Sequence, residues 1–370
     1  MTKDAASGGR LDSLDALRGF DMLWISGGDM LLSALRDITG WGPLHWATEQ
    51  MEHVPWEGFH FYDLIFPMFL FISGVTIPLA VARRRARGEG SASLFFRFTR
   101  RALLLIFLGM VYNGFFNFDW PNMRYASVLS RIGLGYYVAA LIATHAGPKV
   151  QAIIAGAILL GYWAIVALVP VPGIGAGIIT PEGSIVGYVD RLLLPGKLWF
   201  TIYDPEGILS TIPAVATALL GALTGHLLMR SDVGQWRKAL LMAGVGVGFV
   251  ALGNLWGLVF PVIKNIWTSS FVLVTAGWSL ILLSFFYAVM DILGWKRWAF
   301  LFILIGMNPL TLYLTQAGMI HYDATVNYFL GGALRIIGTP WAGFWFASAL
   351  LALKLGFLYV LYRNKIFLRV

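Results

Sequence analysis

The fold of this chain is decided by the stretch His53-Val-Pro-Trp-Glu-Gly-Phe-His-Phe-Tyr-Asp-Leu-Ile-Phe-Pro-Met-Phe-Leu-Phe-Ile-Ser-Gly74. It places an imidazole, aromatic rings and carboxylates directly before a run apolar enough to cross a membrane. A histidine at a membrane–water boundary can stay neutral near pH 7 and act as a base or a nucleophile. The same pattern is also typical of an interfacial belt, in which Trp56, His60 and Tyr62 lie at headgroup depth. The rest of the chain has to decide between the two interpretations.

Composition places the chain in a membrane. Hydrophobic residues make up 58% of the sequence and charged residues 12%, a balance that a soluble domain of 370 residues does not need. Several apolar runs are long enough for the roughly 20 residues of a spanning helix. These runs are continuous instead of alternating at a period of two, which excludes a β-barrel. The sequence therefore predicts an all-α, polytopic membrane helix bundle.

We predict about ten transmembrane helices in one domain over residues 1–370, with a tail at 1–12 and a long loop at 171–210. The expected spans are Ala16–Leu35, Tyr62–Ala82, Ala102–Phe118, Ala126–Thr144, Val150–Pro170, Thr211–Met229, Ala239–Phe260, Ser269–Met290, Trp298–Ile320 and Trp341–Tyr362. The polar stretch at 1–10 shows no cleavable signal, so we expect the first helix to direct its own insertion. Glycines inside the spans, such as Gly244, Gly246 and Gly248, are expected to allow close helix contacts.

Basic residues predict the orientation. If both termini share one side, that side holds 18 of the 27 Lys and Arg residues, and the opposite loops hold six. The positive-inside rule then makes both termini cytoplasmic and the loop at 171–210 extracytoplasmic. The net charge of +8 reflects this bias, so no nucleic-acid binding is expected. We expect an integral protein of a bacterial cytoplasmic (inner) membrane, and a homodimer stays open as its assembly.

The chain has no cysteine and six histidines, none in His-Glu-x-x-His spacing. A disulfide, a thiolate nucleophile and a cysteine-based metal site are therefore excluded. No metal cofactor is expected.

Four charged residues lie in or beside the first predicted span: Asp15, Arg18, Asp21 and Asp29. Charges at membrane depth usually face the protein interior or a water-filled path, and a structural ion pair explains them equally well. Asp29 lies 14 residues after Asp15, or roughly 21 Å along a helix, at the level of His53. A carboxylate there could orient the imidazole.

Two outer segments carry polar groups suited to a sugar or an anion. Tyr203-Asp-Pro-Glu-Gly207 is a turn before the sixth span, and it also fits a capped helix entrance. Lys264-Asn-Ile-Trp-Thr-Ser-Ser270 offers a cation, an amide and an indole, although a plain connector fits as well. Arg131 and Asn308 are polar residues inside spans that need partners, whether for a ligand or for helix packing.

These pieces together resemble a known family. The residues that carry the resemblance, in family order, are Ser13-Leu-Asp-Ala-Leu-Arg-Gly19, the block His53–Trp56–Gly58–Asp63–Pro67–Gly74, Arg131-Ile-Gly-Leu-Gly135, Tyr203-Asp-Pro-Glu-Gly207, Lys264-Asn-Ile-Trp267 and Gly306-Met-Asn308. They are similar to the heparan-α-glucosaminide N-acetyltransferase family and its bacterial relatives, from about Arg10 to the last span.

The resemblance implies a transferase that takes acetyl-CoA from the cytoplasm and acetylates the amine of a glucosamine-type sugar on the far side. His53 matches the family's active-site histidine, whereas Asp29 stands where the lysosomal enzyme carries an asparagine. An envelope glycan or a smaller amino sugar suits this chain better than heparan sulfate, because the large luminal domain is missing. Whether His53 becomes acetylated or deprotonates the amine in a ternary complex stays open.

The expected site residues follow from the clusters and the resemblance. The catalytic residues are expected to be His53 and Asp29. The substrate-binding residues are expected to be Trp56, Glu57, Asp63, Asp204, Glu206, Lys264, Asn265 and Trp267. The co-substrate acetyl-CoA is expected to contact Arg18, Arg131 and Asn308, and Arg83, Arg84, Arg85, Arg87, Arg100 and Arg101 are expected to steer its phosphates.

Two other functions use the same features. A transporter or flippase also needs charges inside the membrane and a polar path, although no repeated halves are visible. An enzyme that O-acetylates an envelope glycan would differ only in its acceptor.

Overall fold

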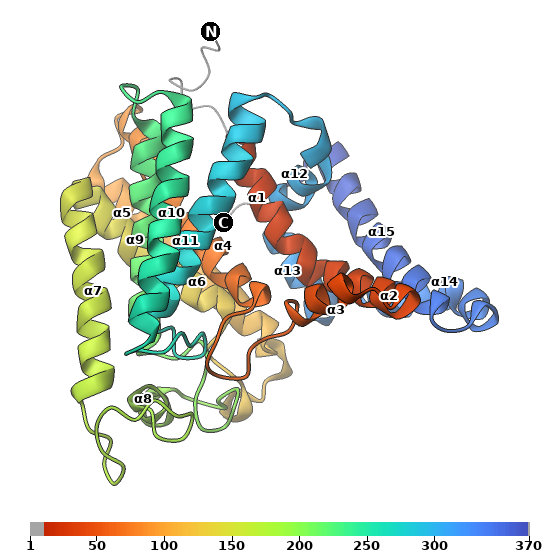
Figure 1. Ribbon diagram of the computed structural model, residues 1–370, viewed down its shortest axis with the longest axis horizontal. Helices are drawn as coiled ribbons and strands as arrows, with labels where there is room; N and C mark the ends of the chain where they lie inside the picture. Colours follow the sequence, from red (N-terminus) through yellow and green to blue (C-terminus); the bar gives the residue numbers. More distant parts are fainter. Residues whose placement is uncertain (1–10, 369–370) are drawn as a thin grey trace.

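The computed structural model describes residues 11–368, and within this range the chain is all-helical, with 74% helix overall and no strands. Helices lie at each of the ten predicted spans (Figure 1). Seven of them are long and apolar enough to cross a membrane: α4 (Phe61–Arg85), α6 (Val128–His145), α7 (Pro148–Leu168), α9 (Thr211–Met229), α10 (Gln235–Gly257), α11 (Ser269–Phe286) with its extension η4 (Tyr287–Ile292), and α15 (Trp341–Arg363). The helical membrane class is confirmed, and the count of ten stays a prediction.

The first predicted span is bent instead of continuous. It consists of α1 (Asp12–Leu23) and α2 (Asp29–Thr39), joined by the π-helical turn η1 (Trp24–Gly28). The break lies at Gly27, whose φ of 123° suits glycine because it has no Cβ. Lys354 of α15 donates to the carbonyl of Ser26 at 2.9 Å and so satisfies a backbone group at the bend.

The third predicted span, Ala102–Phe118, is shifted along the chain. The helix α5 runs over Ser91–Tyr112. It therefore begins before Arg100 and Arg101, which directly precede the predicted span. Long arginine side chains can extend from a helix end toward water, so a charge inside the pattern need not end the helix. Gly114, with a φ of 93°, lies where the chain leaves α5.

The ninth predicted span, Trp298–Ile320, is broken into η5 (Arg297–Ala299), α12 (Phe300–Met307), α13 (Pro309–Leu314) and η6 (Thr315–Met319). Asn308 takes non-helical angles between α12 and α13, and the next residue is Pro309, which cannot donate a backbone hydrogen bond.

The sequence pattern missed three helices that lie between the predicted spans. These are α3 (Gly42–Glu49), α8 (Ile185–Leu193) and α14 (Tyr322–Ile337). Both α3 and α8 are short, and α8 lies inside the segment predicted as a long loop, 171–210. Two 3₁₀ turns, η2 (Phe115–Asn117) and η3 (Trp120–Asn122), follow α5.

The packing between α4 and α9 depends on small residues. A Cβ on Gly74 would lie 2.1 Å from the carbonyl oxygen of Ala218, and one on Gly221 would lie 2.1 Å from that of Phe71. Backbones that approach this closely exclude any side chain at these positions. Of the glycines named from the sequence, Gly246 makes such a contact on α11, whereas Gly244 lies in open space.

The bundle has two chemically different ends, and Figure 1 shows both. The end that we call the arginine-rich end carries the α4–α5, α9–α10 and η4–η5 turns at the top of the view. The end that we call the histidine end carries α8 and the segments before α4 and after α10. The α4–α5 turn follows the arginines of α4, and His53 precedes α4, so the two lie at opposite ends of one helix.

We predict that Gly221→Ala destabilises the protein by about 1–3 kcal/mol, because the added methyl group has no space beside Phe71. The matched control is Gly244→Ala, which adds the same methyl group to an open position and should be neutral or stabilising. Thermal unfolding of the detergent-purified variants measures both. Equal melting temperatures for the two variants would contradict the close packing of α4 on α9.

Candidate functional site

The centre of the site is Asp63, in the first turn of α4. Its carboxylate is 1% exposed and accepts hydrogen bonds from the His53 ring at 2.8 Å and from the backbone N–H of His60 at 3.1 Å. The ammonium of Lys264 lies 3.3 Å away. A buried carboxylate needs such partners, because an uncompensated charge away from water is costly. Asp63 had been expected to bind substrate, whereas in the structure it binds His53.

The contact with Asp63 determines how His53 can act. The bond involves Nδ1, so the tautomer that satisfies the carboxylate carries its proton there and leaves Nε2 with a lone pair. The ring packs on that of Tyr62, with centroids 4.7 Å apart, and its side chain is 51% exposed. Asp63 thus holds the imidazole at Nδ1 while about half of the side chain stays exposed, an arrangement that suits a general base.

Lys264 supplies a cation at the edge of the same ring. Its Nζ lies 2.8 Å from Nδ1 and 3.0 Å from Nε2 of His53, which places the ammonium beside the carbon between the two nitrogens. Burial lowers the pKa of Lys264, and the charge of Asp63 counters part of that shift.

Backbone contacts hold the two site segments together. Glu57 and Ile263 form an antiparallel bridge, and the N–H of Gly58 donates to the carbonyl of Val262 at 2.9 Å. The side-chain amide of Asn265 donates to the carbonyl of Pro55 at 3.0 Å. The segments before α4 and after α10, about 210 residues apart in sequence, therefore form one wall.

The indole of Trp56 stabilises that wall. Its N–H donates to the carbonyl of Ile179 at 2.9 Å, and its ring lies edge-on to Tyr203 with centroids 5.3 Å apart. These contacts are structural. A role of Trp56 and of the exposed Glu57 in binding substrate stays a prediction.

A second charged cluster forms around Arg124. From the sequence, this residue had been counted only among the six basic residues of the loops opposite the termini. Its guanidinium donates to Asp204 at 2.7 Å and 2.5 Å and also to Glu206. Burial works against this charge, but the bonds to Asp204 and the charge of Glu206 outweigh it and raise the pKa of Arg124. The structure thus joins Asp204 and Glu206, which the sequence predicted as site residues, through Arg124, which it did not.

Asp190 of α8 was also missed. It is fully buried, and its carboxylate accepts from the N–H groups of Asp204 at 3.3 Å and Ile208 at 3.0 Å. A Cβ on Gly207 would lie 2.1 Å from that carboxylate, so glycine is needed for the close approach. Burial raises the pKa of Asp190 to about 6. Asp190 therefore shapes the turn that presents Asp204 and Glu206.

The two clusters share the wall of a large cavity of about 1120 Å³. At the histidine end it is lined by His53, Tyr62, Arg124, Glu206, Lys264 and Asn265. Residues that lie toward the arginine-rich end also line it, namely Leu11, Asp15, Arg18, Leu79, Arg83 and Arg101. One cavity therefore has lining residues from both ends of the bundle.

Two predicted site residues are buried in the protein instead. Arg131 is 1% exposed, donates to Ser210 and lies over the ring of Trp267 at 4.9 Å. Trp267 is 1% exposed and donates to Thr217 at 3.2 Å. This cation–π contact between α6 and the turn before α11 is a packing contact, and binding roles for Arg131 and Trp267 stay predictions.

Asn308, expected to bind the co-substrate, holds the segment after α15. Its amide donates to the carbonyl of Ile366 at 3.1 Å, and the N–H of Leu368 donates to its oxygen at 3.1 Å. Leu368 also lines the cavity. Arg18 lines it too and pairs with Asp15 at 3.2 Å.

Asp29, expected to orient His53, accepts a hydrogen bond from the N–H of Met30 at 2.8 Å. It interacts electrostatically with Tyr62, the residue whose ring packs on His53. The direct carboxylate partner of His53 is Asp63. Within residues 11–368 no group of three potential ligands is placed to hold a metal ion.

We predict that Asp190 gives the protein a pH-dependent stability. Folding raises the pKa of Asp190 from 3.8 to about 6. Its buried charge therefore lowers the free energy of unfolding by its full amount above pH 6, and this destabilisation disappears as the pH falls toward 4. Lowering the pH from 7 to 4 should therefore stabilise the original protein relative to Asp190→Asn by up to about 3 kcal/mol of unfolding free energy. Thermal unfolding at both pH values measures it. A pH-independent difference would show that Asp190 does not titrate in this range.

The chain is similar to known proteins over most of its length. A family model described as a domain of unknown function (DUF5009) matches residues 10–118. Heparan-alpha-glucosaminide N-acetyltransferase from Homo sapiens is 26% identical over 382 residues, which cover 86% of this chain and 54% of that protein. The Mus musculus protein of the same name is 26% identical over 390 residues, covering 88% and 55%. The chain spans about half the length of these relatives. The resemblance read from the motifs is therefore confirmed, and the chain is a distant relative of the heparan-α-glucosaminide N-acetyltransferases.

Proposed function

We propose that this protein is a membrane acetyltransferase. It moves an acetyl group from acetyl-CoA, which enters at the arginine-rich end, to the amine of a glucosamine-type sugar at the histidine end. The observation that carries the proposal is the single cavity that has lining residues from both ends and the His53–Asp63 pair in its wall. Acetyl-CoA is too polar to cross lipid, so its thioester has to reach the acceptor inside the protein.

The His53–Asp63 pair supports base catalysis. Asp63 holds the Nδ1 proton, and Nε2 of His53 takes a proton from the acceptor amine as its nitrogen attacks the thioester carbonyl. A carbon–nitrogen bond forms, the carbon–sulfur bond breaks, and the thiolate leaves and takes up the proton from His53. The products are the N-acetylated sugar and free CoA.

Lys264 is placed to stabilise the charge that develops on the carbonyl oxygen. It lines the cavity beside His53, and its side chain is 17% exposed. A fixed cation in a water-poor site stabilises an oxyanion more strongly than the same cation in water. In this proposal Asp63 serves as its counterion until the oxyanion forms.

The arginine-rich end would receive the phosphates of acetyl-CoA. Arg18, Arg83 and Arg101 line the cavity there. Arg84 is paired with Glu89 at 3.1 Å, and Arg85 donates to a backbone carbonyl at 2.6 Å, so these two are less available than expected. The first three are the cations to which we assign the co-substrate.

The membrane assignment rests on the seven apolar helices, and we propose the bacterial inner membrane with both termini in the cytoplasm. Neither the single chain nor the relatives support the homodimer considered from the sequence, and it forms no part of the proposal.

We predict that His53→Ala lowers acetyl transfer by about 10²–10⁴-fold. The matched control is His45→Ala in α3, an exposed histidine that does not line the cavity. Release of free CoA from acetyl-CoA by the purified protein, with and without glucosamine, measures the activity. CoA release that requires glucosamine distinguishes this enzyme from a transporter, and absence of release with N-acetylglucosamine, which keeps the hydroxyls but has no free amine, distinguishes it from an O-acetyltransferase. Near-normal turnover by a folded His53→Ala protein would exclude His53 as the base.

A sealed vesicle of uniform orientation should acetylate an impermeant amino sugar only when acetyl-CoA is on the face that bears Arg83. The reason is that the donor and the acceptor enter the cavity from opposite ends. The chain has no cysteine, so a Glu52→Cys variant treated with an impermeant thiol reagent reports which face bears the histidine end. Activity with both substrates on one face alone would contradict transfer across the membrane.

A further inference from the structure

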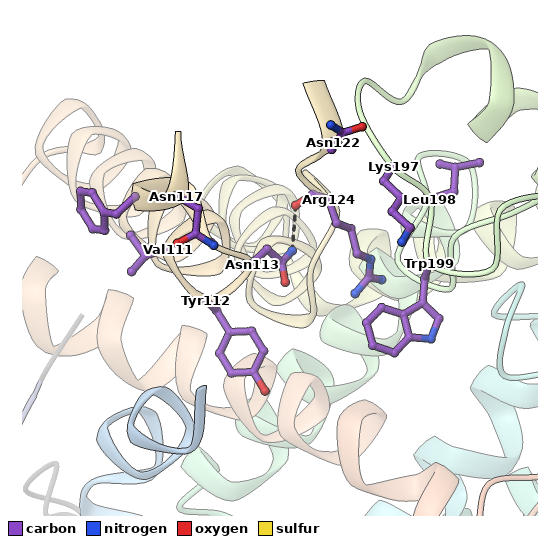
Figure 2. A pocket seen from close by; sticks show the side chains of 11 residues that line it. Val111, Tyr112, Asn113, Asn117, Asn122, Arg124, Lys197, Leu198 and Trp199 are labelled. Carbon is purple, nitrogen blue, oxygen red and sulfur yellow. Dashed lines mark hydrogen bonds between the residues drawn. The ribbon is translucent and has the colours of Figure 1, made fainter. Parts of the chain in front are cut away.

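Three tyrosines of the described chain, Tyr62, Tyr112 and Tyr313, line the cavity that contains His53, which we call the central cavity. Two of them satisfy each other. The rings of Tyr112 and Tyr313 stack with centroids 4.7 Å apart, and their hydroxyls share a hydrogen bond. Figure 2 shows Tyr112 beside Asn113, with its hydroxyl turned away from that amide. Tyr62 has no such partner.

Tyr62 lies beside the candidate base. It is the second residue of α4, it is half-buried, and its backbone N–H donates to the carbonyl of Gln50 at 3.0 Å. Its ring packs on the His53 ring, with centroids 4.7 Å apart and planes tilted by 55°. The next residue is Asp63, which holds Nδ1 of His53. The start of the helix and the contact between the two rings therefore fix where the phenol lies.

The hydroxyl of Tyr62 forms no hydrogen bond with any group in residues 11–368, and it is not sealed from the cavity. Asp29 interacts electrostatically with Tyr62, but its carboxylate accepts from the N–H of Met30 and not from the phenol. The sequence pattern had allowed Tyr62 to belong to an interfacial belt, in which its hydroxyl would lie among lipid headgroups. The structure places the residue in the wall of the central cavity.

A free phenol beside the base lies next to whatever adjoins the reacting amine. In the proposed reaction Nε2 of His53 takes a proton from that amine, so the amine nitrogen lies about 2.6–3.2 Å from Nε2. In glucosamine the carbon that bears the amine lies between two carbons that bear hydroxyls. One of these hydroxyls therefore comes close to the groups that flank the imidazole, Tyr62 and Lys264. Lys264 is the counterion of Asp63 and is assigned above to the carbonyl oxygen, which leaves Tyr62 for the hydroxyl.

A phenol is chemically suited to this partner. A phenol and a sugar hydroxyl can each donate and accept one hydrogen bond, so either direction satisfies both groups. A tyrosine ring that is already held by packing loses little conformational entropy when its hydroxyl binds a ligand. A site that hydrogen-bonds a substrate hydroxyl also discriminates against an analogue that lacks it, because the site's own polar group is then left unpaired.

We propose that Tyr62 is a specificity-determining residue whose hydroxyl binds the hydroxyl next to the reacting amine, so that the preferred acceptor is a vicinal amino alcohol. This inference rests on the proposed function and specifies the chemical class of its acceptor. His53 acts on the amine, and Tyr62 selects amines whose neighbouring carbon bears a hydroxyl. No covalent bond forms or breaks at the phenol.

The test compares kcat/KM for glucosamine with the values for 1-deoxyglucosamine and 3-deoxyglucosamine, each of which keeps the amine and lacks one neighbouring hydroxyl. Release of free CoA by the full-length protein in detergent measures all three. The original protein should prefer glucosamine to at least one analogue. In Tyr62→Phe, which keeps the ring and removes only the hydroxyl, this preference should fall roughly three- to tenfold. The matched control is Tyr112→Phe, which removes a cavity phenol that already has a partner and should leave the preference unchanged.

The possible outcomes separate this role of Tyr62 from the proposed function. An original protein that acetylates the three amines equally well would overturn the role of Tyr62 and leave the proposed function intact. The same holds for a Tyr62→Phe protein that keeps the original preference, as expected of a residue in a headgroup belt. An equal loss with all three amines would assign the phenol to the reaction itself and overturn it as a selector of the acceptor. Absence of acetylation of every amine by the original protein would overturn the proposed function and this inference with it.

Discussion

The buried charge of Asp63 is the constraint on which this site depends. A carboxylate whose side chain is 1% exposed at the end of a membrane helix has to be compensated, and two other segments converge on it to do so. His53 comes from the segment before α4, and Lys264 comes from the segment after α10. The same contacts orient the imidazole and place a cation beside it, so the requirement that stabilises the fold also arranges the candidate catalytic groups. Removing Lys264 would take away the cation that lies beside the buried Asp63 charge.

The helices provide the space for this arrangement by packing closely in one place and breaking in another. Gly74 and Gly221 bring α4 and α9 into backbone contact, which gives a tight and rigid core beside the cavity. On the other side, the chain breaks at Gly27 and at Asn308. Broken helices free backbone polar groups, and a membrane protein tolerates them where other groups satisfy those atoms or where they line a cavity. Lys354 satisfies the backbone at the first break, and the segment at 366–368 binds the second.

The histidine end combines two buried acidic centres with different tasks. Asp63 organises the reacting groups, whereas Asp204, itself held by Asp190, organises Arg124 and Trp199. Both centres lie in or beside connecting segments supported by rigid helices, where binding and catalytic residues are commonly found. Groups held by both centres therefore line the same wall of the central cavity. It also explains why most of the motif residues at this end have structural partners, since each position in the wall is held by several contacts.

The sequence alone determined the class of the protein and pointed to the segment that carries the candidate site. Apolar runs report the membrane helices because hydropathy is a local property, and the block that begins at His53 is continuous in the sequence. Tertiary structure alone decided which carboxylate serves His53. The sequence analysis proposed Asp29 for that role and Asp63 for binding substrate, and only the folded chain shows the 2.8 Å bond between His53 and Asp63. It alone also joined Arg124 to Asp204, which are 80 residues apart in sequence. It placed Lys264 beside His53, from which it is 211 residues away in sequence. Such pairs leave no periodic or local signal, because they arise from how helices pack and where their ends meet, which depends on the whole chain.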